Sequence, residues 1–179
     1  KAEVLEFLSV RPVHTVVMTS FITDNGLVSA NNRGVFYSYR NVAGQLEGVA
    51  LIGHTTLVEA RTEDAVTALA LKARESETPI HIMMSDGDSI ESFWQYYSNE
   101  KQQPRLVCEE RLFEIKHPVM VRDEVPGLQL ATADQLLPIA EAHAEVAFEE
   151  SGVNPMEKDR EGYLKRVLRR IEQGRVWAV

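Results

Sequence analysis

The sequence predicts a mixed α/β fold, an α+β arrangement in which helices flank a mostly antiparallel sheet. Two helical patterns open the chain, three β-rich runs follow them, and helical and strand-like runs then alternate. Of the 179 residues, 44% are hydrophobic and 26% are charged, which is typical of a globular protein. A chain of this length forms one domain or two small ones.

Two helices are predicted at the start of the chain. Residues 2–10 place apolar side chains on one helical face. Pro12 suits the first turn of the next helix, because the N–H that proline lacks would have no partner there. That helix runs to about Thr23 and ends at Gly26, since glycine accepts the positive φ that follows many helices.

An antiparallel meander and a helix are predicted next. Residues 34–40, 49–54 and 55–60 are rich in aromatic and β-branched side chains, as strands are. Consecutive strands with short turns between them pair as neighbours. Thr62 then caps a helix over residues 63–75.

The rest of the first pattern predicts two more strands with a helix between them. Residues 80–84 are a candidate for a buried strand, and residues 106–116 for a further strand. Asp88 is expected to cap the helix, with Glu91 at the third position of a capping box. Cys108 is followed by Glu109 and Glu110, which disfavour the reactive thiolate, so we interpret it as a small buried hydrophobic side chain.

The pattern predicts two domains. Residues 1–117 form the first domain, residues 118–128 form a connector with two prolines and a glycine, and residues 129–179 start a second pattern. The chain stops on a strand at residues 175–179. Because a lone strand exposes unpaired backbone groups, we expect the natural protein to continue beyond Val179.

The second pattern reads strand, helix, loop, helix, strand. A short strand at residues 129–131 precedes Thr132 and Gln135, which have the spacing of a capping box. The helix that follows has an apolar face made of Leu136, Ile139, Ala140, His143, Val146 and Ala147. A loop at residues 151–155 leads to a second helix at residues 158–173.

Charge and composition exclude several classes of function. Lys and Arg number 19 against 27 Asp and Glu, a net charge of -8, so we predict no nucleic-acid partner, since phosphate binding needs a basic excess. No apolar run approaches the ~20 residues that span a bilayer, which predicts no membrane partner. The single cysteine allows no internal disulfide and fits a cytoplasmic location.

The sequence predicts neither a metal site nor a phosphate loop. The five histidines lack metal-binding spacing, and His81 and His143 are interpreted as structural histidines, the second partly buried on its helix face. Residues 59–64 and 85–89 join strands to helices and carry carboxylates. Those carboxylates stabilise the helix ends and repel a pyrophosphate, so both junctions are interpreted as ordinary caps.

The last third of the chain separates its charges. Residues 133–150 carry five acids and neither Lys nor Arg, whereas residues 156–175 carry seven bases and four acids. Two solvated helix faces that pair with each other would explain this distribution. Alternatively, Glu149 and Glu150, at the mouth of the following loop, attract a cationic or amine substrate.

Several strings of the second pattern resemble a known family. Residues 131–138 (Ala-Thr-Ala-Asp-Gln-Leu-Leu-Pro), residues 148–155 (Phe-Glu-Glu-Ser-Gly-Val-Asn-Pro) and the run from Tyr163 to Ala178 are similar to the opening of a GNAT-superfamily N-acetyltransferase domain. Pro12-Val13-His14-Thr15 and the elements after it resemble the degenerate GNAT-like N-terminal domain of a bacterial two-domain subgroup.

This resemblance implies a function for the full-length protein. It would transfer an acetyl group from acetyl-CoA to the amine of a small molecule or peptide. Glu149, Glu150, Asn154 and Tyr163 would line the acceptor loop. The family holds the pyrophosphate of acetyl-CoA with a Gln/Arg-x-x-Gly-x-Gly/Ala loop, and residues 59–64 lack its glycines. The cofactor loop and the catalytic residues are expected beyond Val179, so the chain by itself is predicted to bind no acetyl-CoA and to be inactive.

Two other hypotheses remain open. Residues 1–117 could be a non-catalytic module that binds a ligand or a regulatory partner, because a fold does not fix a function. The aromatic residues to inspect are Phe36, Tyr37, Tyr39, Trp94, Tyr96 and Tyr97. The first domain could also be purely structural, covering a sheet edge or forming a homodimer.

Overall fold

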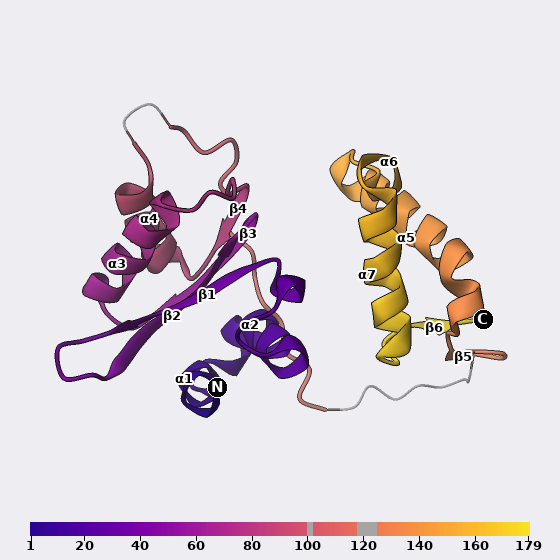
Figure 1. Cartoon of the computed structure of the whole chain (residues 1–179), viewed down its shortest axis with the longest axis horizontal. Helices are drawn as coiled ribbons and strands as arrows, with labels where there is room; N and C mark the ends of the chain where they lie inside the picture. Colours follow the sequence, from indigo (N-terminus) through magenta and orange to yellow (C-terminus); the bar gives the residue numbers. More distant parts are fainter. Residues whose placement is uncertain (100–101, 118–124) are drawn as a thin grey trace. The chain divides into compact units, whose positions relative to one another are not determined.

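The chain divides into two compact units. The computed structural model describes residues 1–99, 102–117 and 125–179, and residues 118–124 of the predicted connector lie outside the described residues. The first unit is Lys1–Lys116 and the second is His117–Val179 (Figure 1). The predicted fold class is confirmed, because a mostly antiparallel sheet is flanked by helices. Among the described residues, no helix is long and apolar enough to cross a membrane.

Two helices open the first unit. Helix α1 is Ala2–Ser9, and α2 is Pro12–Asn25, with Pro12 in its first turn and Gly26 in the left-handed φ region after its end. The buried Thr15 joins them, because its Oγ1 lies 2.7 Å from the carbonyl oxygen of Leu8. A single 3₁₀ turn at Ala30–Asn32 leads into the sheet.

The sheet has four strands in the order β1-β2-β3-β4. Strands β1 (Gly34–Arg40), β2 (Leu46–Gly53) and β3 (Thr55–Ala60) form the predicted antiparallel meander. Strand β4 (Ile82–Met84) pairs parallel with β3. Helix α3 (Glu63–Arg74) makes the crossover between them, and α4 (Gly87–Tyr97) follows β4.

Each face of this sheet buries its own core. Along β2, Ala50 and Ile52 pack with α3 and α4, whereas Val49 and Leu51 pack with α1 and α2. This division follows from the alternation of side chains along a strand. The sheet is therefore the middle of three layers, with α1 and α2 on one face and α3 and α4 on the other (Figure 1).

Two predictions for the edge of the first unit are wrong. Strand β4 covers only part of residues 80–84, and its Ile82 and Met84 are about half exposed, because β4 is an edge strand. Residues 106–116 form no strand, and their apolar side chains are exposed. Cys108 is consequently exposed as well, not buried.

The predicted cap of α4 also differs. Asp86, not Asp88, is the N-cap, and its carboxylate accepts the N–H of Ser89. The helix thus begins two residues earlier than the spacing of Asp88 and Glu91 suggested. The capping-box spacing favoured Asp88, but Asp86 is the residue that precedes the first helical turn.

The second unit consists of three helices between two short strands. Its elements are β5 (Gln129–Leu130), a 3₁₀ turn (Ala133–Gln135), α5 (Leu136–Ser151), α6 (Pro155–Lys158), α7 (Arg160–Glu172) and β6 (Trp177–Ala178). Strands β5 and β6 pair antiparallel. The predicted capping box of Thr132 and Gln135 is present.

The buried face of α5 is rotated from the prediction. His143 and Val146 are exposed, and Ala144 is buried in their place. Ala140, Val167 and other apolar side chains form the core between α5, α7 and β6. The interpretation of His143 as a partly buried residue is therefore wrong, because the small alanines let α5 and α7 approach along the neighbouring stripe.

Candidate functional site

A charged cluster lies where the first unit brings α2, β3 and α4 together. Arg11, just before α2, places a guanidinium nitrogen 2.5 Å from an oxygen of Asp86 and 3.4 Å from an oxygen of Glu59. Glu59 is the buried member of the cluster, with its side chain only 8% exposed. The parallel pairing of β3 and β4 brings Glu59 and Asp86 to the same end of the sheet.

The two carboxylates of this cluster have opposite pKa shifts. Burial raises the pKa of Glu59 above its ordinary value, and the positive charge of Arg11 opposes that shift. Partial burial also acts to raise the pKa of Asp86, but hydrogen bonds from Ser89 and Arg11 outweigh it and hold that pKa below its ordinary value. The positive charge of Arg11 therefore favours the ionised form of both carboxylates.

A pocket of about 200 Å³ lies beside this cluster, at the N-terminal ends of α3 and α4. Its lining residues are Ala60, Arg61, Thr62, Glu63, Val66, Asp88, Ser89 and Ser92. The N-terminal end of each helix is already capped by a side chain, because Thr62 accepts a backbone N–H of α3 and Asp86 accepts one of α4. The pocket therefore offers hydroxyl and carboxylate groups to a polar or cationic ligand, and it is poorly suited to a pyrophosphate.

The structure places the four predicted acceptor residues on three elements of the second unit. Glu149 and Glu150 are exposed on the last turns of α5. Asn154 is the N-cap of α6, and its Oδ1 accepts the N–H of Met156 at 2.9 Å. Tyr163 of α7 is half-buried against the core of this unit. None of the four lines either of the pockets described in this section.

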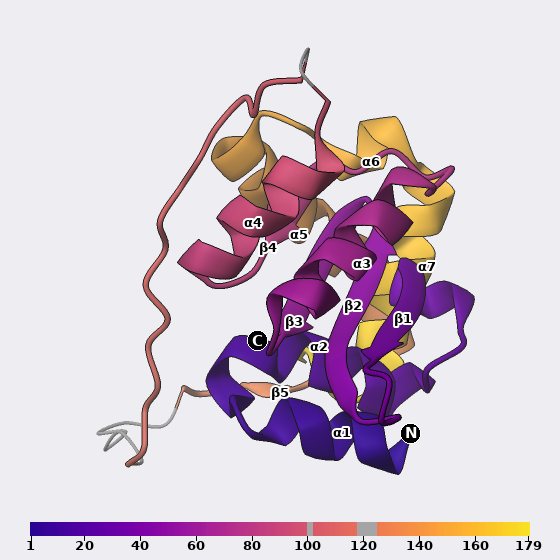
Figure 2. The ribbon, with the colours of Figure 1, turned by 90° about the vertical axis from the view of Figure 1, so that its left-hand side faces the viewer.

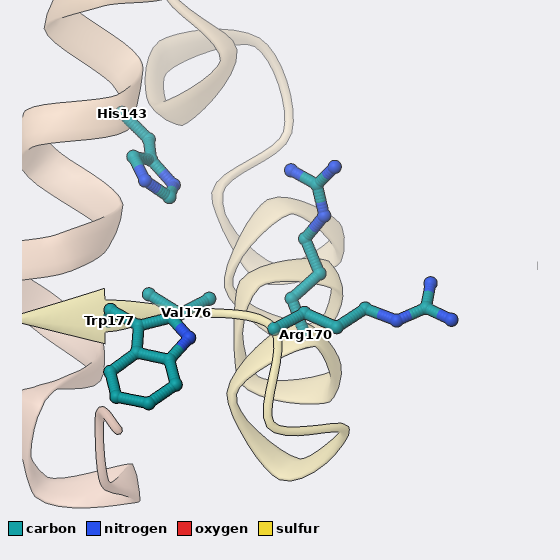
Figure 3. Close-up of a pocket in the computed structure, with 5 residues that line it drawn as sticks. His143, Arg170, Val176 and Trp177 are labelled. Carbon is teal, nitrogen blue, oxygen red and sulfur yellow. The ribbon is translucent and has the colours of Figure 1, made fainter. Parts of the chain in front are cut away.

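A second pocket, of about 300 Å³, was not predicted. It is lined by His143, Arg170, Arg175, Val176 and Trp177. Figure 3 shows the imidazole of His143 on α5 and the indole of Trp177 on β6 on the same side of the pocket. The excess of basic residues after position 156 was the only signal of this pocket in the sequence, because its members come from separate elements.

Metal-ligating side chains do not gather in the described part of the chain. No group of three or more His, Cys, Asp or Glu side chains there could hold a metal ion. The closest pairing of histidines is an exposed stack of His54 on His81, with ring centroids 5.1 Å apart. His81 lies just before β4, not within a strand as predicted.

Comparison with protein-family models, curated proteins and solved structures finds no match for this chain. Function is therefore inferred from the residues, their pairing and their chemistry.

Proposed function

We propose that this chain is part of an N-acetyltransferase of the GNAT type that acts in the cytoplasm. The amine of a small molecule or peptide would attack the thioester carbonyl of acetyl-CoA within a ternary complex. The C–N bond forms, the C–S bond breaks, and the amine gives up a proton as the thiol of coenzyme A leaves. The proposal rests first on the resemblance of the sequence strings.

The arrangement of the first unit is consistent with the resemblance. Two helices precede an antiparallel meander, and β3-α3-β4 then forms a parallel crossover. A pocket lies at the carboxyl ends of β3 and β4. Ligands of α/β proteins commonly bind at the carboxyl ends of parallel strands. The degenerate GNAT-like domain inferred from the sequence shares this order as far as α4, but its last expected strand, at residues 106–116, is not formed.

The second unit supports the proposal in a different way. Its strand, helix, helix, strand order has the two strands paired antiparallel, which is the opening expected of the acetyltransferase domain. The exposed carboxylates of Glu149 and Glu150 lie on the last turns of α5. Two negative charges beside a loop attract a protonated amine, so these residues are proposed to gather the acceptor.

The first unit is proposed to be non-catalytic. Thr62 and Asp86 occupy the helix ends that would otherwise bind the pyrophosphate of acetyl-CoA, and residues 59–64 contain no glycine. The alternative of an aromatic ligand site is weakened by the packing. Of the aromatic residues considered for it, Phe36, Tyr37, Tyr39 and Tyr97 pack against the cores, and the ring of Trp94 lies tilted against Tyr97.

Two assays test the proposal. Calorimetry should detect no tight binding of acetyl-CoA to the 179-residue chain, whereas the product of the complete gene should release coenzyme A thiol when supplied with acetyl-CoA and an amine panel. Tight binding to the 179-residue chain would contradict the account of the capped helix ends. No thiol release with any amine would refute the enzyme assignment.

The acceptor residues have a matched control on the same helix. In the complete enzyme, replacing Glu149 and Glu150 by Gln should raise KM for cationic amines several-fold and leave kcat nearly unchanged, because the lost charge acts on encounter and binding. Replacing the exposed Glu141 and Glu145 by Gln removes the same charge from α5 and should leave KM unchanged. Equal effects of the two double variants would show that only net charge matters.

A further inference from the structure

The basic pocket of the second unit offers positive charge and hydrogen-bond donors to a ligand. It encloses about 300 Å³ and is lined by His143, Arg170, Arg175, Val176 and Trp177. Four of these five side chains carry N–H groups, and none of them carries a carboxylate. Figure 3 shows three of the donors, which come from α5, α7 and β6. The pocket is therefore locally basic in a chain whose net charge is -8.

The turn after α7 holds the two arginines of this pocket together. Helix α7, drawn in yellow in Figure 2, ends at Glu172, and Gly174 follows it with a φ of 65°. The N–H of Gly174 donates to the carbonyl oxygen of Ile171. The N–H of Arg175 donates to the carbonyl oxygen of Arg170, and these two atoms are 3.0 Å apart. The two hydrogen bonds define a Schellman motif, whose outer positions, here both arginine, commonly make an apolar contact.

Two arginines at these positions favour an anionic ligand. Like charges at one turn repel each other, whereas an anion between them is attracted by both. Lys165 and Arg166, earlier on the same helix, each pair with a carboxylate at the helix start. Arg170 has no such partner among the described residues, so its guanidinium is available to a ligand in the pocket.

Trp177 adds an aromatic surface to the same pocket. The residue is 59% exposed, and its indole N–H has no hydrogen-bond partner within the described part of the chain. The neighbouring Val176 is 9% exposed and belongs to the core of this unit, so the backbone that carries the indole is held in place. His143 is held similarly, because it adjoins the buried Ala144 on α5. Exposed indoles stack on flat rings.

We propose that this pocket binds a small phosphate ester that carries a flat ring. Arginine recognises phosphate through two parallel N–H···O bonds, and a phosphate monoester has three acceptor oxygens and nearly two negative charges for the two guanidinium groups. The phosphate lies between Arg170 and Arg175, and the ring packs on Trp177. The site is made of side chains, unlike the capped helix ends of the first unit, and the proposal is independent of acetyl transfer.

Nuclear magnetic resonance on the 179-residue chain tests the proposal, with phenyl phosphate as the probe. The chain has two tryptophans and therefore two indole N–H signals, which Trp177→Phe assigns. Phenyl phosphate should shift the signal of Trp177 in a saturable way and leave that of Trp94 unmoved. It should bind at least about fivefold more tightly than inorganic phosphate, because only the ester carries a ring that stacks. Benzyl alcohol, which carries the ring without the phosphate, should cause no saturable shift.

Two charge-matched variants show whether the arginines act as a site. Arg170→Gln should weaken the binding of phenyl phosphate at least about tenfold, because it removes charge-assisted hydrogen bonds. Arg160→Gln removes the same charge from an exposed position of α7 outside the pocket. It should change the affinity less than about twofold, since salt screens exposed charges at a distance. In calorimetry, Trp177→Leu should abolish the preference for phenyl phosphate over inorganic phosphate.

Three results would overturn the proposal. If phenyl phosphate causes no saturable shift, the arginines only offset the dipole at the end of α7. Equal losses of affinity in Arg170→Gln and Arg160→Gln would show that net charge alone attracts the anion. Equal affinities for phenyl phosphate and inorganic phosphate would contradict the assigned ligand class. The backbone amide spectrum of each variant shows whether the fold is kept.

Discussion

Replacing Arg11 by Met should destabilise the first unit through the buried charge of Glu59. Methionine keeps the aliphatic length of the arginine stem and removes only the guanidinium. The side chain of Glu59 is 8% exposed, so its carboxylate would be left buried without the cation that faces it. Asp86 would lose the same partner at 2.5 Å.

The size of this effect follows from the exposure of the pair. Removing one partner of a fully buried ion pair costs about 3–5 kcal/mol. The side chain of Arg11 is 33% exposed, so water can reach part of the vacated space, and we expect a loss of about 2–3 kcal/mol at neutral pH. Replacing Glu59 by Gln in the Met variant should recover most of that loss, because the uncompensated charge is removed.

The loss of stability caused by Arg11→Met should be larger at pH 7 than at pH 4. The pKa of Glu59 is raised in the folded chain above the ordinary value of 4.5, so folding is favoured when this carboxyl is protonated and disfavoured as the pH rises through its folded pKa. Without Arg11 this penalty grows. The pKa of Asp86 is lowered below 3.8, so its stabilising contribution is present above that pH and is lost below it. The deficit of the Met variant should therefore be greatest near pH 7 and shrink toward pH 4.

Urea unfolding followed by tryptophan fluorescence measures the effect. In a Trp177→Phe background, Trp94 is the remaining tryptophan and reports on the first unit. Arg40→Met is the control, because it breaks an exposed ion pair with Glu3 and should leave the midpoint nearly unchanged. An unchanged midpoint for Arg11→Met at pH 7, or a deficit as large at pH 4 as at pH 7, would refute the reasoning.

Three further predictions test local features. Gly53→Ala would place a methyl group 2.2 Å from the carbonyl oxygen of Arg33 and should cost about 1–3 kcal/mol in urea unfolding, whereas Gly87→Ala meets no atom within 4 Å and should cost nothing. Thr15→Val removes a buried hydroxyl hydrogen bond between α1 and α2, and should lower the unfolding free energy by about 1 kcal/mol. Asn154→Ala removes the cap of α6 and should cost about 0.5–2 kcal/mol, seen as an earlier loss of helical circular dichroism.

Local patterns predicted most of the elements. The meander, the start of α2 at Pro12 and the cap at Thr62 are all found where the sequence places them. Each depends on residues within a few positions of one another, through the period of a strand or the geometry of a helix end. The errors at Asp86, Ala144 and residues 105–116 arose where a local pattern favoured one assignment and the folded chain adopts another.

The sequence predicted the helices and strands better than it predicted the sites. Arg11, Glu59 and Asp86 are far apart in the chain, and no spacing rule relates them. The basic pocket around Arg170 and Trp177 likewise draws on α5, α7 and β6. The four residues assigned to an acceptor loop, by contrast, lie on three elements, and none of them lines a described pocket.

The sequence by itself determined most of the helices and the meander strands, because those elements depend on short-range periodicity and capping. Only the tertiary structure decided which strand lies at an edge and which carboxylates share a cation. The parallel pairing of β3 with β4 sets both, since it brings Glu59 beside Asp86 and leaves β4 with a free edge. Pairing between distant segments depends on the whole topology, and the free energy that selects it is spread over both cores of the first unit.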